Sequence, residues 1–232
     1  MINTKEIGNW RQSWKTKKNE KLLSIKEINN QDEIIKESIK RAYSPSVQNT
    51  ALKQGKYGHK KLQAIKEICE PVMFEFFVKI VNNKELDEQI FEKWEKGLAD
   101  KIRSIYLENE ISLYTYGNAQ KWINMTIKYM FSSDKTNPND MLYQVCYLPI
   151  DRIIQDKAYK ELGVKKLPVA WSKCDNWNEI KLYQERIKDA IIKQTNYNTR
   201  LWWECNAWTV NIEHVAKKIL NKHKKAFKEL SK

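Results

Sequence analysis

The stretch YTYGNAQKWINMTIKYMF, Tyr114–Phe131, has the pattern of an amphipathic helix entered through a glycine turn. We expect the helix to run from Asn118 to about Phe131, after a connection that contains Gly117. Lys121 then falls in the first helical turn, beside Trp122. The first turn of a helix carries partial positive charge and usually favours an acidic side chain. An ammonium group at this place therefore needs an explanation.

Helical spacing of apolar residues extends over most of the 232-residue chain, and only six glycines and five prolines interrupt it. The pattern predicts an all-α, multi-helix globular fold. Further helices are predicted within residues 19–43 (broken near Asn29 and Asn30), 60–83, 84–109, 149–162, 175–194 and 211–230. The loop at 44–59 is the best candidate boundary, dividing an N-terminal helical segment (1–58) from a helical core (59–232). A single domain is the alternative.

The chain carries 42 basic and 29 acidic side chains, a formal net charge of +13. Such an excess favours a polyanionic partner, most often nucleic acid. The richness in Lys, Asn and Ile would also follow from an AT-rich coding sequence. That bias explains many lysines better than it explains their excess over acids.

Several classes of protein are excluded by what the sequence lacks. The four cysteines are far apart and form no C-x-x-C pair, which predicts reduced thiols in a cytoplasmic protein and no metal site. The chain has no signal-peptide pattern and no run of eighteen apolar residues, so we expect no membrane partner. Phosphate-binding glycine motifs and clustered histidines are also absent, and we expect no cofactor.

Two short segments carry a resemblance to a known family. YGNAQKWINMTIKYM (116–130) followed by YLPIDRII (147–154) resembles the catalytic core of the helix-hairpin-helix DNA glycosylases, most closely the archaeal 8-oxoguanine branch. The resemblance covers roughly residues 102–162. It implies a helix-hairpin-helix unit, a central cleft, and a monomer acting on duplex DNA that carries a modified base. One glycine stands here where common members have two, which weakens the match to their phosphate-binding loop.

The resemblance assigns roles to individual residues. Lys121 matches the family nucleophile, Asp151 the catalytic carboxylate, Arg152 the basic residue after it, and Gly117 the hairpin glycine. Independently, the helix dipole and burial against Trp122 should both penalise the ammonium of Lys121, and a neutral amine is a nucleophile. Everted bases stack on aromatic side chains. The tryptophans available for this are Trp122, Trp171, Trp177, Trp202, Trp203 and Trp208, of which we select Trp122, Trp171 and Trp203.

Each assignment has a plainer alternative. Lys121 can be a solvated lysine on an amphipathic helix, and Asp151 a helix N-cap without further function. Lys128 is the second choice of nucleophile. The tryptophans can belong to the core, with Glu204 and Asp175 among them as possible readers of a base edge. The rivals to a glycosylase are a non-catalytic helical nucleic-acid-binding protein and a helical protein that binds an acidic partner.

Overall fold

The computed structural model describes residues 4–17, 30–47, 52, 57–137 and 139–207. Within these ranges the chain forms helices and no strand, which confirms the all-α prediction. The α-helices are α1 (Thr4–Lys17), α3 (Gln31–Val47), α4 (His59–Val81), α5 (Glu88–Glu108), α6 (Tyr116–Phe131), α7 (Met141–Val145), α8 (Arg152–Leu162) and α9 (Trp177–Gln194), with a short 3-10 helix η3 (Trp171–Lys173). Residues 200–207 are also helical. The helix-hairpin-helix unit and the central cleft stay predictions.

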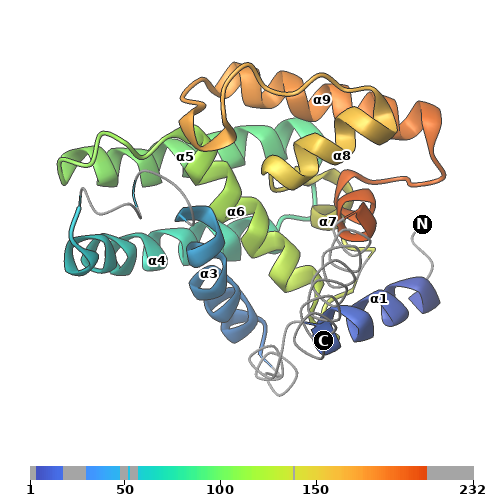
Figure 1. The fold of residues 1–232 in the computed structure, drawn as a ribbon. Coiled ribbons are helices and arrows are strands. Elements are labelled where there is room, and N and C mark those ends of the chain that lie inside the picture. The colour runs from blue at the N-terminus through green and yellow to red at the C-terminus, as the bar shows by residue number, and fades with distance from the viewer. Residues whose placement is uncertain (1–3, 18–29, 48–51, 53–56, 138, 208–232) are drawn as a thin grey trace, which may run out of the picture.

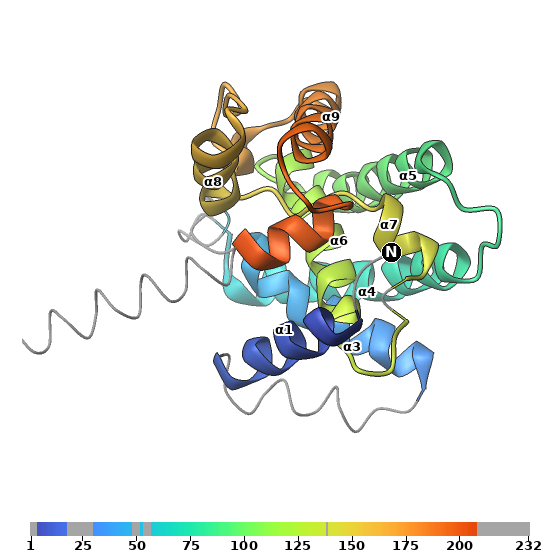
Figure 2. The same cartoon turned by 90° about the vertical axis from the view of Figure 1, so that its right-hand side faces the viewer.

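Helix α6 lies at the centre of the molecule, with other helices around it in both views (Figures 1 and 2). Every residue from Gly117 to Phe131 is buried. A surface helix with this amphipathic pattern would keep its polar face in water. The polar face is buried as well, because side chains from α5, α8 and the segment 200–207 supply partners for it.

The start of α6 is fixed by a capping box. The Thr115 hydroxyl accepts a hydrogen bond from the Asn118 amide, and the Asn118 side chain accepts one from the Thr115 amide, each at 3.3 Å. The helix therefore begins at Tyr116, before the predicted start at Asn118. Lys121 lies in the second turn as a result. The dipole effect falls off within the first turn, so it contributes less to Lys121 than the sequence suggested.

The other end of α6 is covered by α1. The Arg11 guanidinium donates two hydrogen bonds to the carbonyl of Phe131, from Nε at 3.0 Å and Nη2 at 2.8 Å. A cation at this position complements the negative end of the helix. Trp10, also on α1, donates from its indole to the carbonyl of Cys205 at 3.1 Å. The described part of the predicted segment 1–58 thus packs into the same apolar core as the rest of the described chain.

Helices α3, α4, α5, α8 and α9 overlap predicted ranges, with local differences, whereas α1, α7 and the helix at 200–207 were not predicted. The helix predicted at 211–230 lies outside the described residues. Helix α3 continues through Pro45 to Val47, into the stretch predicted as a loop. Helix α5 is capped by Asp87, whose carboxylate accepts from the Ile90 amide at 2.7 Å. Helix α8 ends at Gly163, which adopts φ +66°, a left-handed conformation that favours glycine. That turn leads the chain back over the molecule.

The segment 163–176, called the strap below, crosses the N-terminal end of α6 (Figure 1). Its backbone lies against Gly117, so that a Cβ added there would be 1.7 Å from the Trp171 carbonyl oxygen. The Gly117 amide donates to the Cys174 carbonyl at 2.9 Å. The glycine is therefore required by this close approach of two backbones.

Substitution of Gly117 by Ala is expected to destabilise the fold by about 2 kcal/mol or more, because the strap must move away from α6. Gly97 on α5 is the matched control, since a Cβ there would meet only Phe76 at 3.9 Å. Gly97→Ala is expected to stabilise the helix by about 0.5–1 kcal/mol. Urea unfolding measures both changes. Equal effects at the two glycines would contradict the role of Gly117.

Candidate active site

The Lys121 and Asp151 side chains form an ion pair. Lys121 Nζ lies 2.6 Å from Asp151 Oδ2, and the two side chains are 6% and 14% exposed. The two residues are thirty positions apart and come from α6 and from the start of α8. Both charges are therefore largely removed from water, although each retains some access to it.

Gln120 holds Asp151 within reach of Lys121. Its side-chain amide accepts from the Ile150 amide at 3.1 Å and donates to the Ile150 carbonyl at 3.1 Å. Gln184 on α9 pairs in the same way with both backbone groups of Leu148, at 3.2 and 2.7 Å. The segment before α8 is extended, and its backbone makes hydrogen bonds to two glutamine side chains where a β-strand would pair with a neighbouring strand. Sequence reasoning missed both glutamines, since no spacing marks a glutamine that will be buried.

Asp151 also caps α8. Its Oδ1 accepts from the Ile154 amide at 2.8 Å, while Oδ2 contacts Lys121, so the two oxygens have separate partners. The predicted capping role is confirmed. Burial on its own raises the pKa of Asp151, but the Lys121 ammonium and the hydrogen bonds from Lys121 and Ile154 outweigh it, and the pKa is lowered. The carboxylate is ionised at neutral pH.

Trp171, on the strap, is the predicted tryptophan that reaches this pair. Lys121 Nζ lies 5.1 Å from the centroid of its ring, a distance at which a cation and an aromatic face attract. The Trp171 side chain is partly exposed to solvent. Because the Lys121 ammonium lies over its ring, the ring covers the ammonium on that side. The structure therefore brings together Gly117, Lys121, Asp151 and Trp171.

Other predicted residues lie elsewhere. Trp122 is fully buried, donates to the Ile39 carbonyl at 2.9 Å and packs on Tyr43, so it does not supply the burial of Lys121 that was expected of it. Trp203 is 2% exposed in the core. Neither tryptophan has a free face for a base. Trp208 lies outside the described residues. Arg152, the first residue of α8, is exposed.

The backbone amides at the start of α6 are engaged within the protein. The Tyr116 amide donates to Asp175 at 3.3 Å, the Gly117 amide to Cys174, and the Asn118 amide to Thr115. Asp175 is also held by a two-point contact with Arg103, at 2.9 and 2.6 Å. A phosphate would have to displace these partners. The first turn of α6, which contains Gly117, thus lacks free amides for phosphate binding.

A second buried ion pair lies further along the same face of α6. Lys128 Nζ contacts Glu204 Oε1 at 2.7 Å, and both side chains are 1% exposed. Seven residues separate Lys128 from Lys121, a rise of about 10 Å along the axis. Burial raises the pKa of Glu204, while Lys128 acts to lower it. Glu204 is therefore an internal partner of Lys128, and its predicted contact with a base edge has no support here.

Between the two pairs, Asn124 donates to Glu95 Oε1 on α5 at 2.7 Å. Glu95 is fully buried, and its other oxygen has no hydrogen-bond partner among the described residues. Burial raises the pKa of Glu95 to about 8, although Asn124 and Arg200 act in the opposite direction. Glu95 is thus largely neutral at pH 7. Its position mid-helix among charged neighbours gave no hint of this burial.

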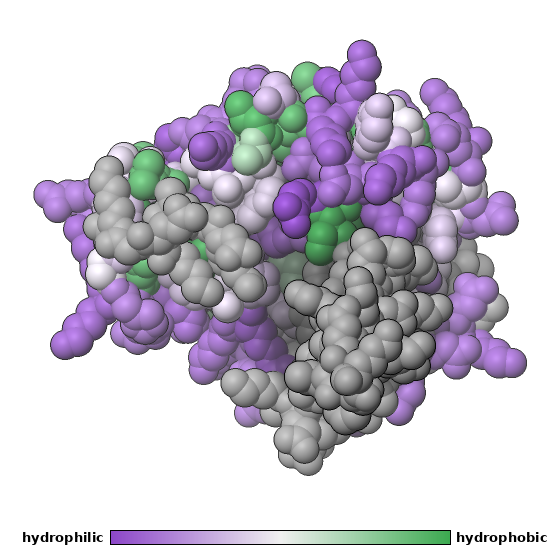
Figure 3. All heavy atoms as spheres, viewed as in Figure 1, coloured by the Kyte–Doolittle hydropathy of each residue, from purple (hydrophilic) through white to green (hydrophobic). Residues whose placement is uncertain are grey.

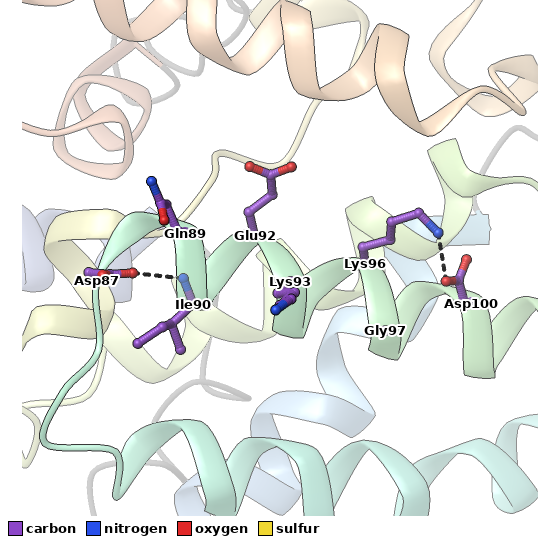
Figure 4. Close-up of a pocket in the computed structure, with 8 residues that line it drawn as sticks. All are labelled: Asp87, Gln89, Ile90, Glu92, Lys93, Lys96, Gly97 and Asp100. Atoms are coloured by element: carbon purple, nitrogen blue, oxygen red, sulfur yellow. Dashed lines mark hydrogen bonds and ion pairs between the residues drawn. The ribbon is translucent and has the colours of Figure 1, made fainter.

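A groove on the outside of α5 is a second candidate location for a functional site, but its lining side chains include few reactive groups (Figure 4). Four of its five charged side chains are already paired: Asp87 caps Ile90, Lys96 contacts Asp100 at 2.7 Å, and Glu92 contacts Lys181 at 2.7 Å. No group of acidic, histidine or cysteine side chains in the described ranges could hold a metal ion. The described helices also include none with the length and apolar character needed to cross a membrane.

Comparisons with known proteins leave the site to be judged on its geometry: no family model, no curated protein and no solved structure matches the chain.

Removal of one member of the Lys121–Asp151 pair is expected to destabilise the fold by about 3 kcal/mol, because the other charge stays buried without its partner. Lys121→Met and Asp151→Asn test this, and asparagine preserves the N-cap. The double variant should recover part of the loss. Chemical denaturation at pH 7 gives the free energies. Fully additive losses would show that the two groups do not interact.

The Lys121–Asp151 pair also predicts that the free energy of unfolding declines as the pH falls into the acid range. Because the folded pKa of Asp151 lies below its unfolded value of about 3.9, the ionised carboxylate stabilises the fold above that value. This contribution is lost as the pH falls through the folded pKa. Asp151→Asn should therefore flatten the decline of unfolding free energy in acid. An unchanged decline would contradict the assignment.

Glu95 predicts the opposite dependence on pH. Between an unfolded pKa of about 4.3 and the folded value, the folded chain holds one more proton than the unfolded chain, so stability falls as the pH rises. Glu95→Gln keeps an acceptor for Asn124 and removes this proton. The variant should gain stability relative to the parent at pH 8 and not at pH 4. Thermal unfolding across this range measures the difference.

Proposed function

We propose that this protein is a DNA glycosylase/lyase that cleaves the N-glycosidic bond of a modified or damaged base, with Lys121 as nucleophile and Asp151 as the catalytic carboxylate. One observation carries the proposal: the 2.6 Å contact between these two side chains, which are thirty residues apart and only slightly exposed. The same two residues carry the sequence resemblance to the glycosylase core. The net charge of +13 fits a polyanionic substrate.

The chemistry requires an amine close to an ionised carboxylate. The Lys121 nitrogen attacks C1′ of the everted nucleotide, a new C–N bond forms, and the glycosidic electron pair leaves with the base. Asp151 is close enough to accept one proton from the Lys121 ammonium, which frees the amine lone pair, and to pass that proton to the departing base, so that the carboxylate is ionised again as positive charge develops on the sugar. Its negative charge also stabilises the cation that develops on the sugar, an effect typically worth a few kcal/mol.

Opening of the sugar ring converts the adduct into a protonated imine on Lys121. A proton acceptor then removes a proton from C2′, which expels the 3′ phosphate and breaks the strand. Water finally hydrolyses the imine and restores the lysine. The base must leave the duplex before any of these steps. Among the predicted tryptophans that the structure describes, Trp171 has its ring beside the amine, which makes it the candidate surface for the everted nucleotide.

The burial of the ion pair also favours a second candidate, a non-catalytic nucleic-acid-binding protein. A lysine and an aspartate that are 6% and 14% exposed can serve the fold alone. Such a protein would retain DNA in a salt-dependent way and would form no covalent intermediate. The two proposals therefore differ in one measurable species, the imine.

Borohydride trapping tests the proposal on duplexes with an abasic site or a modified guanine. The parent should form a covalent complex. Lys121→Arg should not, although arginine retains the charge that pairs with Asp151. Asp151→Asn should slow trapping by about 100-fold or more. Lys101→Arg, on the exposed surface of α5, is the matched control and should trap like the parent. Salt-dependent DNA binding without trapping by the parent would favour the binding protein.

A further inference from the structure

A recess lies at the C-terminal end of α6, away from the Lys121–Asp151 pair. It has a volume of about 460 Å³, within the range of sites that bind small molecules. Met130, one of its lining residues, is nine residues beyond Lys121, a rise of about 14 Å along the helix. The recess is therefore separate from the candidate active site.

The floor of the recess is apolar and comes from α3, α4, α6, α7 and the connection after α4. Its members are each at most 4% exposed: Ile34, Ile80, Leu86, Met130 and Leu142. On the face of the molecule shown in Figure 3, the described hydrophobic residues that reach the surface form small patches among hydrophilic ones. The recess instead gathers several apolar side chains at one hollow. A flat apolar group that enters it leaves water, which stabilises the complex.

The rim of the recess is polar, and its side chains are Gln31, Asn83, Lys84, Lys135, Asn137 and Asp140. Lys84 and Lys135 are exposed and form no ion pair or hydrogen bond with any residue that the structure describes. Asp140 is the one acidic residue in the described lining. The rim thus carries more positive than negative charge, which favours an anionic ligand.

The two lysines have no structural task at the helix ends that precede them. Lys84 follows the end of α4 and Lys135 the end of α6, places where a lysine can hydrogen-bond the last carbonyls. At α6 the Thr136 hydroxyl donates to the Met130 carbonyl instead, at 3.0 Å. Arg11 in turn donates to the Thr136 carbonyl and hydroxyl, each at 3.1 Å. These bonds fix the loop beside the recess and leave both ammonium groups available to a ligand.

Side-chain amides on the rim add hydrogen-bonding groups of a particular kind. Asn83 Oδ1 accepts from the Glu85 amide at 2.9 Å, which orients the side chain and leaves its amino group without a partner in the described part of the chain. The Gln31 side chain makes no hydrogen bond with the described residues either. An amide side chain presents one donor and one acceptor side by side, the arrangement that matches the edge of a nucleobase.

From this combination we propose that the recess is a binding site for a nucleoside monophosphate. The base lies on the apolar floor, Lys84 and Lys135 contact the phosphate, and the Gln31 and Asn83 amides meet the edge of the base. A phosphate monoester carries a charge of about −1.5 to −2 at pH 7, which two ammonium groups match. The site goes beyond the glycosylase function proposed above and does not depend on it.

Isothermal titration calorimetry of the full-length protein with the four ribonucleoside 5′-monophosphates tests the site. At least one of them should bind with a Kd of roughly 10–100 µM. The matching nucleoside, which lacks the phosphate, and inorganic phosphate, which lacks the base, should each bind about tenfold more weakly or worse. Each of these two probes keeps the contacts of only one part of the recess.

Charge variants on the rim locate the binding. Lys84→Gln and Lys135→Gln should each weaken it by about tenfold. Asp140→Asn should tighten it by about threefold, because a negative charge beside the phosphate is removed. Lys93→Gln is the matched control, since Lys93 is also exposed but lines the groove on α5. This variant should bind like the parent. Thermal unfolding checks that all four variants are folded.

Three results would overturn the proposal. No binding of any monophosphate at about 1 mM would show that the recess does not hold a nucleotide. Binding that is the same in both rim-lysine variants as in the parent would place the nucleotide elsewhere. Inorganic phosphate that binds as tightly as the nucleotides would reduce the recess to an anion site. None of these results bears on Lys121, whose role is decided by borohydride trapping.

Discussion

The complete burial of α6 is the constraint on which the rest of the structure depends. A buried polar group without a hydrogen-bond partner destabilises the fold by roughly 1–3 kcal/mol. Each polar side chain on this helix therefore requires a partner. Gln120, Lys121, Asn124 and Lys128 lie along one face, and their partners are Ile150, Asp151, Glu95 and Glu204. These partners bring α5, α8 and the segment 200–207 against α6. The helix thus organises the fold through its polar residues as much as through its apolar ones.

The Lys121–Asp151 contact has two consequences that oppose each other. In the free protein, the carboxylate stabilises the buried ammonium and the ammonium stabilises the carboxylate. In the proposed reaction the same carboxylate must receive a proton from the Lys121 ammonium and give it up to the departing base before its negative charge can stabilise a cationic sugar. A substrate that enters between the strap and the pair would change the surroundings of both charges.

The strap connects the fold to the site. Its backbone is held against Gly117, its Trp171 ring borders the amine, and its tip reaches solvent. The amides at the start of α6, which a phosphate-binding loop would leave free, are used to hold the strap and Asp175. In the proposed complex, side chains such as Arg152 and the strap lysines are therefore the candidates for contact with a phosphate backbone near α6.

The sequence by itself determined the helical class, most helix positions and the cap at Asp151, because apolar periodicity and capping residues act over a few neighbouring positions. It also selected Lys121, Asp151, Gly117 and Trp171, but only through a short resemblance and the chemistry of an amine beside a carboxylate. Only the tertiary structure decided that α6 is buried all round, that Gln120 sets Asp151 beside Lys121, and that Trp122 and Trp203 belong to the core. Burial depends on what packs against a residue from distant parts of the chain, and no local spacing contains that information.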